Sequence, residues 1–187
     1  MKNIFKTKLN TASLVLIPAC IGINYLGKLF ASVLKLPLWL DSIGTCIGGA
    51  LGGPIIGAIC GSITLVYALT SLGIGLVVGI MARLGKMEKV NGALLTSLAG
   101  GLAAVLISTP LNVIFWGGTT GNVWGDAVFA ATQAANLPVV LGSFLDEVVV
   151  DVPDKIITVL IVFAILKGLP KKLTALYDVN DSVESLD

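Results

Sequence analysis

Residues 42–82 read SIGTCIGGAL GGPIIGAICG SITLVYALTS LGIGLVVGIM A, and this stretch contains no charged residue. A second uncharged window covers residues 90–125. Each window is longer than the roughly 20 residues that a helix needs to cross the hydrocarbon core of a bilayer. Across the chain 56% of the residues are hydrophobic and 12% are charged, and the mean hydropathy is +0.97. This pattern predicts an all-α integral membrane protein that crosses the cell membrane several times.

The basic residues form three groups that lie near predicted helix ends. The groups are Lys2, Lys6 and Lys8; Arg83, Lys86 and Lys89; and Lys167, Lys171 and Lys172. Because Lys and Arg are enriched on the cytoplasmic side, we expect all three groups inside, with an even number of crossings between them. Lys28 and Lys35 follow the first apolar segment and oppose this arrangement weakly, since lysine at a helix end can extend to the interface.

Hydropathy and turn residues predict six transmembrane helices with both termini in the cytoplasm. The predicted spans are residues 10–34, 40–51, 55–69, 71–84, 92–113 and 154–169. Residues 1–9 form the predicted cytoplasmic N-terminus, 10–170 the membrane domain, and 171–187 a polar cytoplasmic tail. Residues 127–135 are predicted to form a short helix at the surface. Residues 138–150 are either a half-span or the start of a long last helix.

A charged run, residues 146–155 (DEVVVDVPDK), lies directly before the last apolar segment. Ionised groups at membrane depth are costly, so they usually pair with each other or face a cavity. The run therefore marks a place for a polar solute or a switching contact, and the alternative is a solvated loop between two spans. Lys155 is expected to pair with Asp151 four residues earlier, or to contact a solute.

Small residues repeat every four positions around the second and third predicted spans, from Gly48 to Gly61. Such repeats let membrane helices approach closely, either inside one chain or against another subunit. The chain has no histidine, and its three cysteines lie at wide spacing inside predicted spans. Nucleophile-elbow, HExxH, phosphate-loop and dinucleotide-binding motifs are all missing from the sequence, so we predict a non-enzyme without a cofactor or metal.

Several segments, in their order along the chain, resemble the substrate-binding (S) components of energy-coupling factor (ECF) transporters. They are residues 38–45 (LWLDSIGT), 51–58 (LGGPIIGA), 75–83 (GLVVGIMAR), 107–110 (ISTP), 117–121 (GGTTG) and 154–157 (DKII). The resemblance implies a six-helix membrane protein that captures a small water-soluble vitamin or heterocyclic precursor outside the cell. It also implies a transmembrane coupling subunit and two cytoplasmic ATPases as partners. The Ala-x-x-x-Ala docking motif that many members carry on their first helix is absent from residues 10–22. The surface that meets the coupling subunit is therefore left open.

The resemblance also implies a solute site in the outer half of the membrane, between the fourth to sixth spans and under the outer loops. The candidate residues there are Asn112, Trp116, Thr119, Asn122, Trp124, Asp151, Asp154 and Lys155, with Trp39, Asp41 and Asn24 as secondary candidates. A flat heterocycle needs an aromatic surface and a few fixed hydrogen bonds, which these residue types supply. Acids outnumber bases in this set, which favours a neutral or cationic solute.

Two other functional classes stay open at this level. The first is a self-contained carrier or channel for a small solute, although the chain has no evident inverted repeat of the kind many carriers contain. The second is a structural membrane protein without a solute, for which glycine-rich helices would suffice. Charges at membrane depth argue against that class, because a scaffold does not need them. Nothing in the sequence predicts a nucleic-acid partner.

Overall fold

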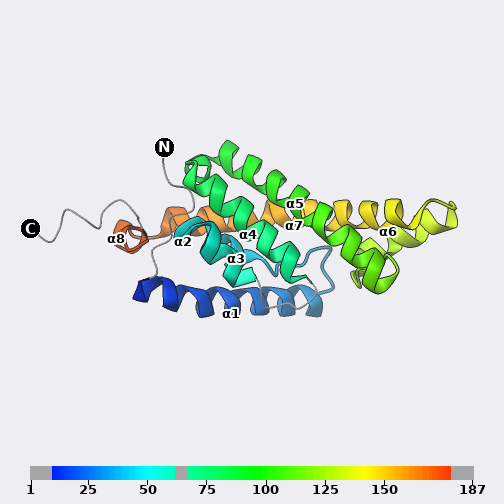
Figure 1. The fold of residues 1–187 in the computed structure, drawn as a ribbon, viewed down its shortest axis with the longest axis horizontal. Coiled ribbons are helices and arrows are strands. Elements are labelled where there is room, and N and C mark those ends of the chain that lie inside the picture. The colour runs from blue at the N-terminus through cyan, green and yellow to red at the C-terminus, as the bar shows by residue number, and fades with distance from the viewer. Residues whose placement is uncertain (1–9, 62–66, 178–187) are drawn as a thin grey trace, which may run out of the picture.

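The computed structural model describes residues 10–61 and 67–177, which form eight α-helices and one short 3-10 helix with no strand among them (Figure 1). The helices are α1 (Thr11–Val33), α2 (Ile43–Gly52), α3 (Pro54–Gly61), α4 (Ala68–Arg83), α5 (Val90–Trp116), α6 (Val123–Ala134), α7 (Val139–Gly168) and α8 (Lys171–Ala175), with the 3-10 helix η1 (Lys86–Glu88) between α4 and α5. The predicted all-α class is thus confirmed for the described residues. The predicted segment 1–9, part of the third predicted span and the end of the tail lie outside them.

Local sequence signals define several helix ends. The side chain of Asn10 accepts a hydrogen bond from Ser13 N at 2.9 Å, and Asn122 accepts one from Trp124 N at 3.0 Å, so asparagines cap α1 and α6. Gly53 separates α2 from α3 at φ +91°, and Gly117 follows α5 at φ +66°. Both angles favour glycine, which explains why the apolar segments end there.

Glycines bring α2, α3 and α4 into backbone contact. A Cβ atom built on Gly57 would lie 2.6 Å from the Cα of Gly49, and one built on Gly75 would lie 2.4 Å from the carbonyl carbon of Gly57. No side chain fits at such distances, so these helices pack on their main chains. The glycine repeats therefore serve packing within this chain.

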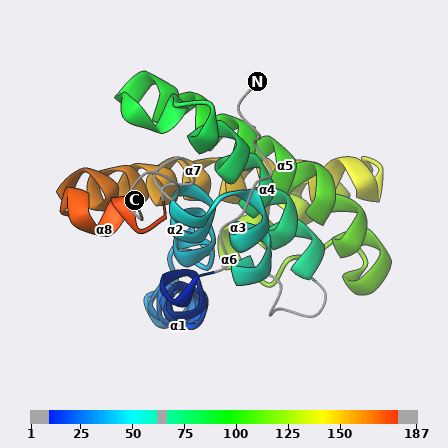
Figure 2. The same ribbon diagram turned by 60° about the vertical axis from the view of Figure 1, so that its left-hand side comes forward.

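Neighbouring helices run in opposite directions. Gly44 of α2 lies against Cys20 of α1, whereas Gly27 lies against Leu40, which makes α1 and α2 antiparallel. Three further pairs of helices are antiparallel for the same reason. Gly52 lies against Ile56 and Gly48 against Cys60 in the pair α2 and α3, and Gly79 lies against Pro54 and Gly61 against Ser71 in the pair α3 and α4. Gly100 lies against Val78 and Gly73 against Ile107 in the pair α4 and α5. Helices α5 and α7 share the most extensive interface and are also antiparallel (Figure 2). Six helices, α1 to α5 and α7, thus alternate in direction along the chain.

The basic groups within the described residues lie toward one end of the bundle. Asn10 Nδ2 donates to the carbonyl of Leu176 at 2.8 Å, which places the start of α1 beside the end of α8. The α4–α5 junction, with Arg83 and Lys86, lies toward the same end, while the loop after α5 and the α6–α7 turn lie at the other (Figure 1). This arrangement agrees with the even number of crossings that the basic residues predict.

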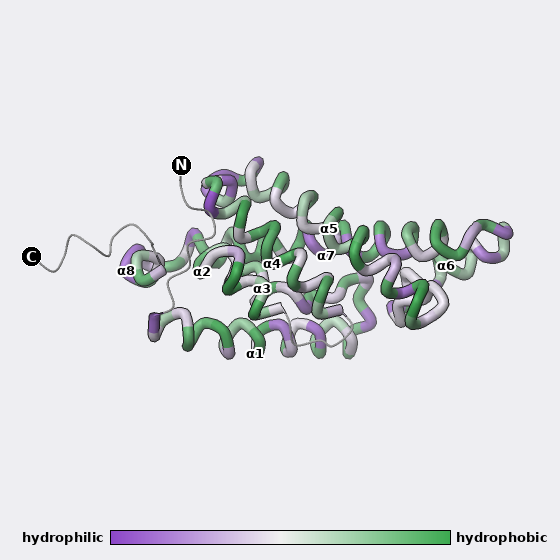
Figure 3. Tube along the Cα trace, viewed as in Figure 1, coloured by the Kyte–Doolittle hydropathy of each residue, from purple (hydrophilic) through white to green (hydrophobic). Residues whose placement is uncertain are grey.

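Among the described residues, α1 and α5 are long and apolar enough to cross a membrane, and α2 and α4 are shorter apolar helices. Their hydropathy is high along most of their length (Figure 3). Helix α1 exposes large apolar side chains such as Leu14, Leu26 and Phe30, as a lipid-facing helix does. Helix α2 has 10 residues and is about 15 Å long, roughly half the thickness of the hydrocarbon core. The described residues thus contain two helices long and apolar enough to span a membrane, and the six-span topology stays a prediction.

Helix α7 contains the whole charged run. It continues without interruption over 30 residues, so residues 138–150 are the start of a long last helix and not a separate half-span. The interpretation of the run as a solvated loop is wrong, because Asp146, Glu147 and Lys155 are buried within this helix. The charges therefore lie inside the bundle, where each requires a partner.

Candidate functional site

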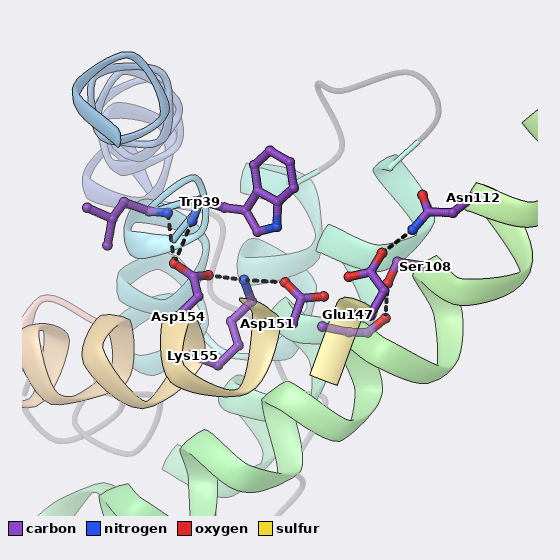
Figure 4. A network of polar contacts seen from close by, with 9 residues as sticks. Trp39, Ser108, Asn112, Glu147, Asp151, Asp154 and Lys155 are labelled. Atoms are coloured by element: carbon purple, nitrogen blue, oxygen red, sulfur yellow. Dashed lines mark hydrogen bonds and ion pairs between the residues drawn. The ribbon is translucent and has the colours of Figure 1, made fainter. Parts of the chain in front are cut away.

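The polar centre of the molecule is an ion-pair cluster on α7. Lys155 Nζ lies 3.6 Å from Asp151 Oδ1 and contacts Asp154 Oδ2, and the Lys155 side chain is only 2% exposed (Figure 4). The predicted pairing of Lys155 with Asp151 is thus confirmed, and Asp154 is a second partner. Asp41, in the turn that precedes α2, also acts on this ammonium group electrostatically. Two carboxylates therefore contact one buried cation, and the carboxyl group of Asp41 acts on it from farther away.

Asp154 also holds the connection between α1 and α2. Its Oδ1 accepts hydrogen bonds from the backbone N–H of Trp39 at 3.0 Å and of Leu40 at 2.8 Å (Figure 4). Leu40 has φ +51°, a left-handed conformation that is uncommon for leucine. The two charge-assisted bonds stabilise this turn, and they fix the position of the Trp39 side chain relative to Lys155.

A second polar chain reaches Glu147 from α5 and from the residue that precedes α4. Tyr67 Oη donates to Asn112 Oδ1 at 2.6 Å, and Asn112 Nδ2 donates to Glu147 Oε1. The Tyr67 ring stacks on Trp116, with ring centroids 5.4 Å apart and planes 5° from parallel. The Glu147 carboxylate is therefore held by a neutral amide, and the tyrosine is held by both its ring and its hydroxyl.

These groups surround a cavity of about 120 Å³ between α4, α5, α7 and the connection from α1 to α2. Its acidic and basic lining residues are Asp41, Glu147, Asp151, Lys155 and, at its rim, Lys28; the others that matter here are Trp39, Tyr67, Thr70, Ser71, Ser108 and Thr120. Three carboxylates, several hydroxyls and two aromatic rings thus converge on a space that holds a small molecule. Such a combination is typical of binding sites for polar ligands with a flat part.

A second cavity of about 230 Å³ adjoins the first. The two share Lys28 and Trp39 in their walls, and the second is also lined by Lys35, Asn122 and residues at the end of α1. It lies between α1 and the start of α6. Trp39 therefore stands at the boundary between an inner cavity rich in acids and an outer cavity with two exposed lysines.

The loop between α5 and α6 is fastened beside the inner cavity by two acids. Thr120 Oγ1 contacts both carboxylate oxygens of Asp146, at 3.2 and 3.3 Å. Asp126 Oδ1 accepts hydrogen bonds from Thr120 N at 2.9 Å and Gly121 N at 3.2 Å. The buried Asp146 thus has a structural role in positioning Thr120, which lines the cavity.

The structure brings most of the sequence-predicted residues together. Four of them line the inner cavity, namely Trp39, Asp41, Asp151 and Lys155. Asp154 and Asn112 lie directly behind this lining through the bonds described above, and Asn122 lines the outer cavity. Asn24 lies elsewhere, where its amide bridges α1 to Thr45 and Gly44 at the start of α2.

Trp116, Thr119 and Trp124 also line neither cavity. Trp116 is 45% exposed and supports Tyr67 from the outside. Thr119 Oγ1 donates to the carbonyl of Trp116 at 3.1 Å, which closes the end of α5. Trp124 is also exposed, and its Nε1 donates to the carbonyl of Lys35 at 3.3 Å. Their roles here are structural.

Sequence reasoning missed the lining residues of α4 and the polar residue Ser108 of α5. Tyr67, Thr70, Ser71 and Ile74 follow the spacing of one helical face, and Ser108 lies one turn from Asn112. Hydroxyl groups at helical spacing in an apolar segment are therefore the sequence signal that indicates these lining residues. Glu147 was assigned to the charged run but not to the site, although it lies two turns before Lys155 on the same face of α7.

Within the described residues, no group of three or more His, Cys, Asp or Glu side chains is arranged to hold a metal ion. Comparison with protein-family models, with curated proteins and with solved structures found no match.

Proposed function

We propose that this chain is the solute-binding membrane subunit of an ECF-type uptake system for a small water-soluble vitamin or related heterocyclic precursor. The observation that carries the proposal is the inner cavity, where buried charges and two aromatic rings converge inside an otherwise apolar helical bundle. Buried ionic groups are costly, so a membrane scaffold without a solute has no reason to keep five of them on one helix.

The position of the cavity supports an outward-facing binding site. It lies among the start of α4, the last turns of α5 and the first half of α7, away from the end that contains Arg83 and Lys86. If those basic residues lie in the cytoplasm, the cavity lies in the outer half of the membrane. A solute would then reach it from outside, past Trp39 and the outer cavity.

The energy source is proposed to be external. The sequence contains no phosphate loop, and its resemblance to S components implies a coupling subunit and two cytoplasmic ATPases in the same membrane. The chain itself would bind the solute and carry out no chemical reaction.

The proposal is tested first by native mass spectrometry of the protein purified in mild detergent. We expect a small molecule of fixed mass to remain bound, and to be lost in Trp39→Ala, which removes the indole between the two cavities. Trp124→Ala is the matched control, because that indole is exposed and lines neither cavity. Equal loss in both variants, or no bound molecule in the wild type, would contradict the proposed site.

Transport is tested in liposomes with the solute identified in this way. We expect binding but no accumulation by the chain alone, and accumulation when the coupling subunit, both ATPases and ATP are added. Uptake driven by an ion gradient in liposomes that contain only this chain would instead identify a self-contained carrier.

A further inference from the structure

The charges around the inner cavity do not balance. The ammonium group of Lys155 is shared by Asp151 and Asp154, which are its ion-pair partners within 4 Å among the described residues. Glu147 lies one turn from Asp151 on the same face of α7 and shares a hydrogen bond with it, and its carboxyl group also accepts one from the neutral amide of Asn112. Asp41 adds a third carboxyl group to the cavity wall. Lys28, the other basic lining residue, is exposed at the rim.

A buried hydroxyl group in the same wall also lacks a partner. Thr70 Oγ1 lies in the lining of the cavity, its residue is 7% exposed, and it makes no hydrogen bond within the described part of the chain. A buried hydroxyl without a partner is uncommon in a folded protein. It is available to a polar atom of a molecule bound in the cavity.

The size of the cavity limits what can occupy it. At about 120 Å³ it is comparable to a cavity of about 150 Å³ that accommodates benzene, so it holds about one ring. The indole of Trp39 and the phenol of Tyr67 form part of its wall and offer surfaces for a flat group. A larger solute would extend past Trp39 into the outer cavity.

We infer that the solute carries a flat, positively charged organic group, about one ring in size, that lies beside Glu147 and Asp151 under Trp39. The inference rests on the proposed function and specifies the class of solute for that site. A cation there balances the net negative charge that Asp151 and Asp154 leave once Lys155 is counted, and it favours the ionised forms of Glu147 and Asp41 in a medium of low dielectric constant. Its N–H groups can donate to Glu147 and Asp151, and Thr70 is available to one of its polar atoms. An anion would face the acidic side chains of Asp41, Glu147 and Asp151. The ammonium of Lys155 is already held by Asp151 and Asp154.

The experiment uses three planar probes of nearly the same shape: benzamidinium (a cation), benzamide (neutral) and benzoate (an anion). Binding to the purified full chain is measured by tryptophan fluorescence and by thermal unfolding in detergent. We expect benzamidinium to bind at least about tenfold more tightly than benzamide, the minimum for a charge-assisted hydrogen bond, and benzoate to bind most weakly.

Two variants assign the effect to the cavity. Glu147→Gln keeps an acceptor for Asn112 but removes the charge, so it is expected to abolish most of the preference for benzamidinium while leaving benzamide binding unchanged. Asp41→Asn, at a half-buried position in the cavity wall, is expected to weaken benzamidinium binding in the same direction. Glu88→Gln, an exposed glutamate on η1, is the matched control and should behave as the wild type.

Several outcomes would overturn the inference. One is tighter binding of benzamide or benzoate than of benzamidinium. Another is no binding of any probe up to 10 mM, which is about the weakest affinity that a one-ring group provides. The third is a preference for benzamidinium that persists in both cavity variants. If NaCl or MgCl2 raised the thermal unfolding temperature as much as benzamidinium does, the site would be assigned to an inorganic cation instead. Failure of this inference is distinct from failure of the proposed function. A neutral co-purified solute that accumulates with ATP would refute the positive charge inferred for the solute, but it would support the transport role.

Discussion

Replacement of Lys155 by methionine tests whether the cluster on α7 is a true buried ion network. Lys155→Met keeps a side chain of similar length and removes the charge from a position that is 2% exposed. Asp151 would then lose its cation, while Asp154 would keep its bonds to the backbone of Trp39 and Leu40. The variant therefore leaves the buried carboxylate of Asp151 without a cation and preserves the adjacent turn.

The magnitude follows from the geometry. Two unit charges 3.6 Å apart interact by ~4–5 kcal/mol at an effective dielectric constant of ~20. Removal of one partner from a buried ion pair destabilises proteins by about 3–5 kcal/mol, because the other charge stays desolvated. We therefore expect Lys155→Met to lower the free energy of unfolding by about 3–5 kcal/mol. The double variant Lys155→Met with Asp151→Asn should recover at least half of that loss.

The assay is unfolding in mixed micelles by a denaturing detergent, followed by tryptophan fluorescence and repeated by thermal unfolding. Lys171→Met on α8 is the control, because that lysine is exposed and its loss should change stability by no more than about 0.5 kcal/mol. A stability of Lys155→Met equal to that of the control would refute the buried network. Equal destabilisation in the single and double variants would show that Asp151 is not the group left unpaired.

Two further predictions concern packing and topology. Gly57→Ala would place a Cβ atom 2.6 Å from the Cα of Gly49 and should destabilise the chain by about 1–3 kcal/mol. Gly22→Ala is the control, because its Cβ atom meets nothing within 4 Å, and it should be neutral or stabilising by roughly 0.5–1 kcal/mol. Equal unfolding curves for the two variants would contradict the close contact of α2 and α3. A cysteine introduced at Lys86 should be shielded from an impermeant thiol reagent in intact cells, while one at Thr120 should react. Labelling at Lys86 from outside would refute the six-span topology. The three native cysteines are buried, and the wild type therefore gives the background labelling.

The helical architecture could be predicted from sequence because its signals are local. Uncharged segments, the Gly-Gly-Pro turn before α3 and the glycine after α5 place most helix ends within a few residues of the structure. The course of α7 could not be settled in the same way. Its charged run is typical of a loop when read by hydropathy alone, and only partners on other segments, such as the backbone of Trp39, make it stable inside a helix.

The candidate site was predictable only in part, for a related reason. Asp151 and Lys155 are four residues apart on one helix, so their pairing follows from helical geometry. The lining from α4 depends on how three glycine-rich helices pack, which brings Thr70 and Ser71 to the same cavity as Glu147 and Asp151 of α7. Nothing in the immediate sequence of these hydroxyl residues distinguishes them from others, such as Thr109 or Ser143, that lie outside the cavity.

The two oxygens of Asp154 separate the structural and binding roles of the charged run. Oδ1 holds the turn with Trp39 and Leu40, while Oδ2 contacts Lys155, so the turn and the ammonium are fixed from one residue behind the cavity wall. A cation that binds at Asp151 would compete with Lys155 for that carboxylate alone. Lys155 would keep Asp154 as its partner, and the bonds that position Trp39 would stay intact. The charge balance inside the cavity can therefore change with occupancy while the aromatic wall above it keeps its position.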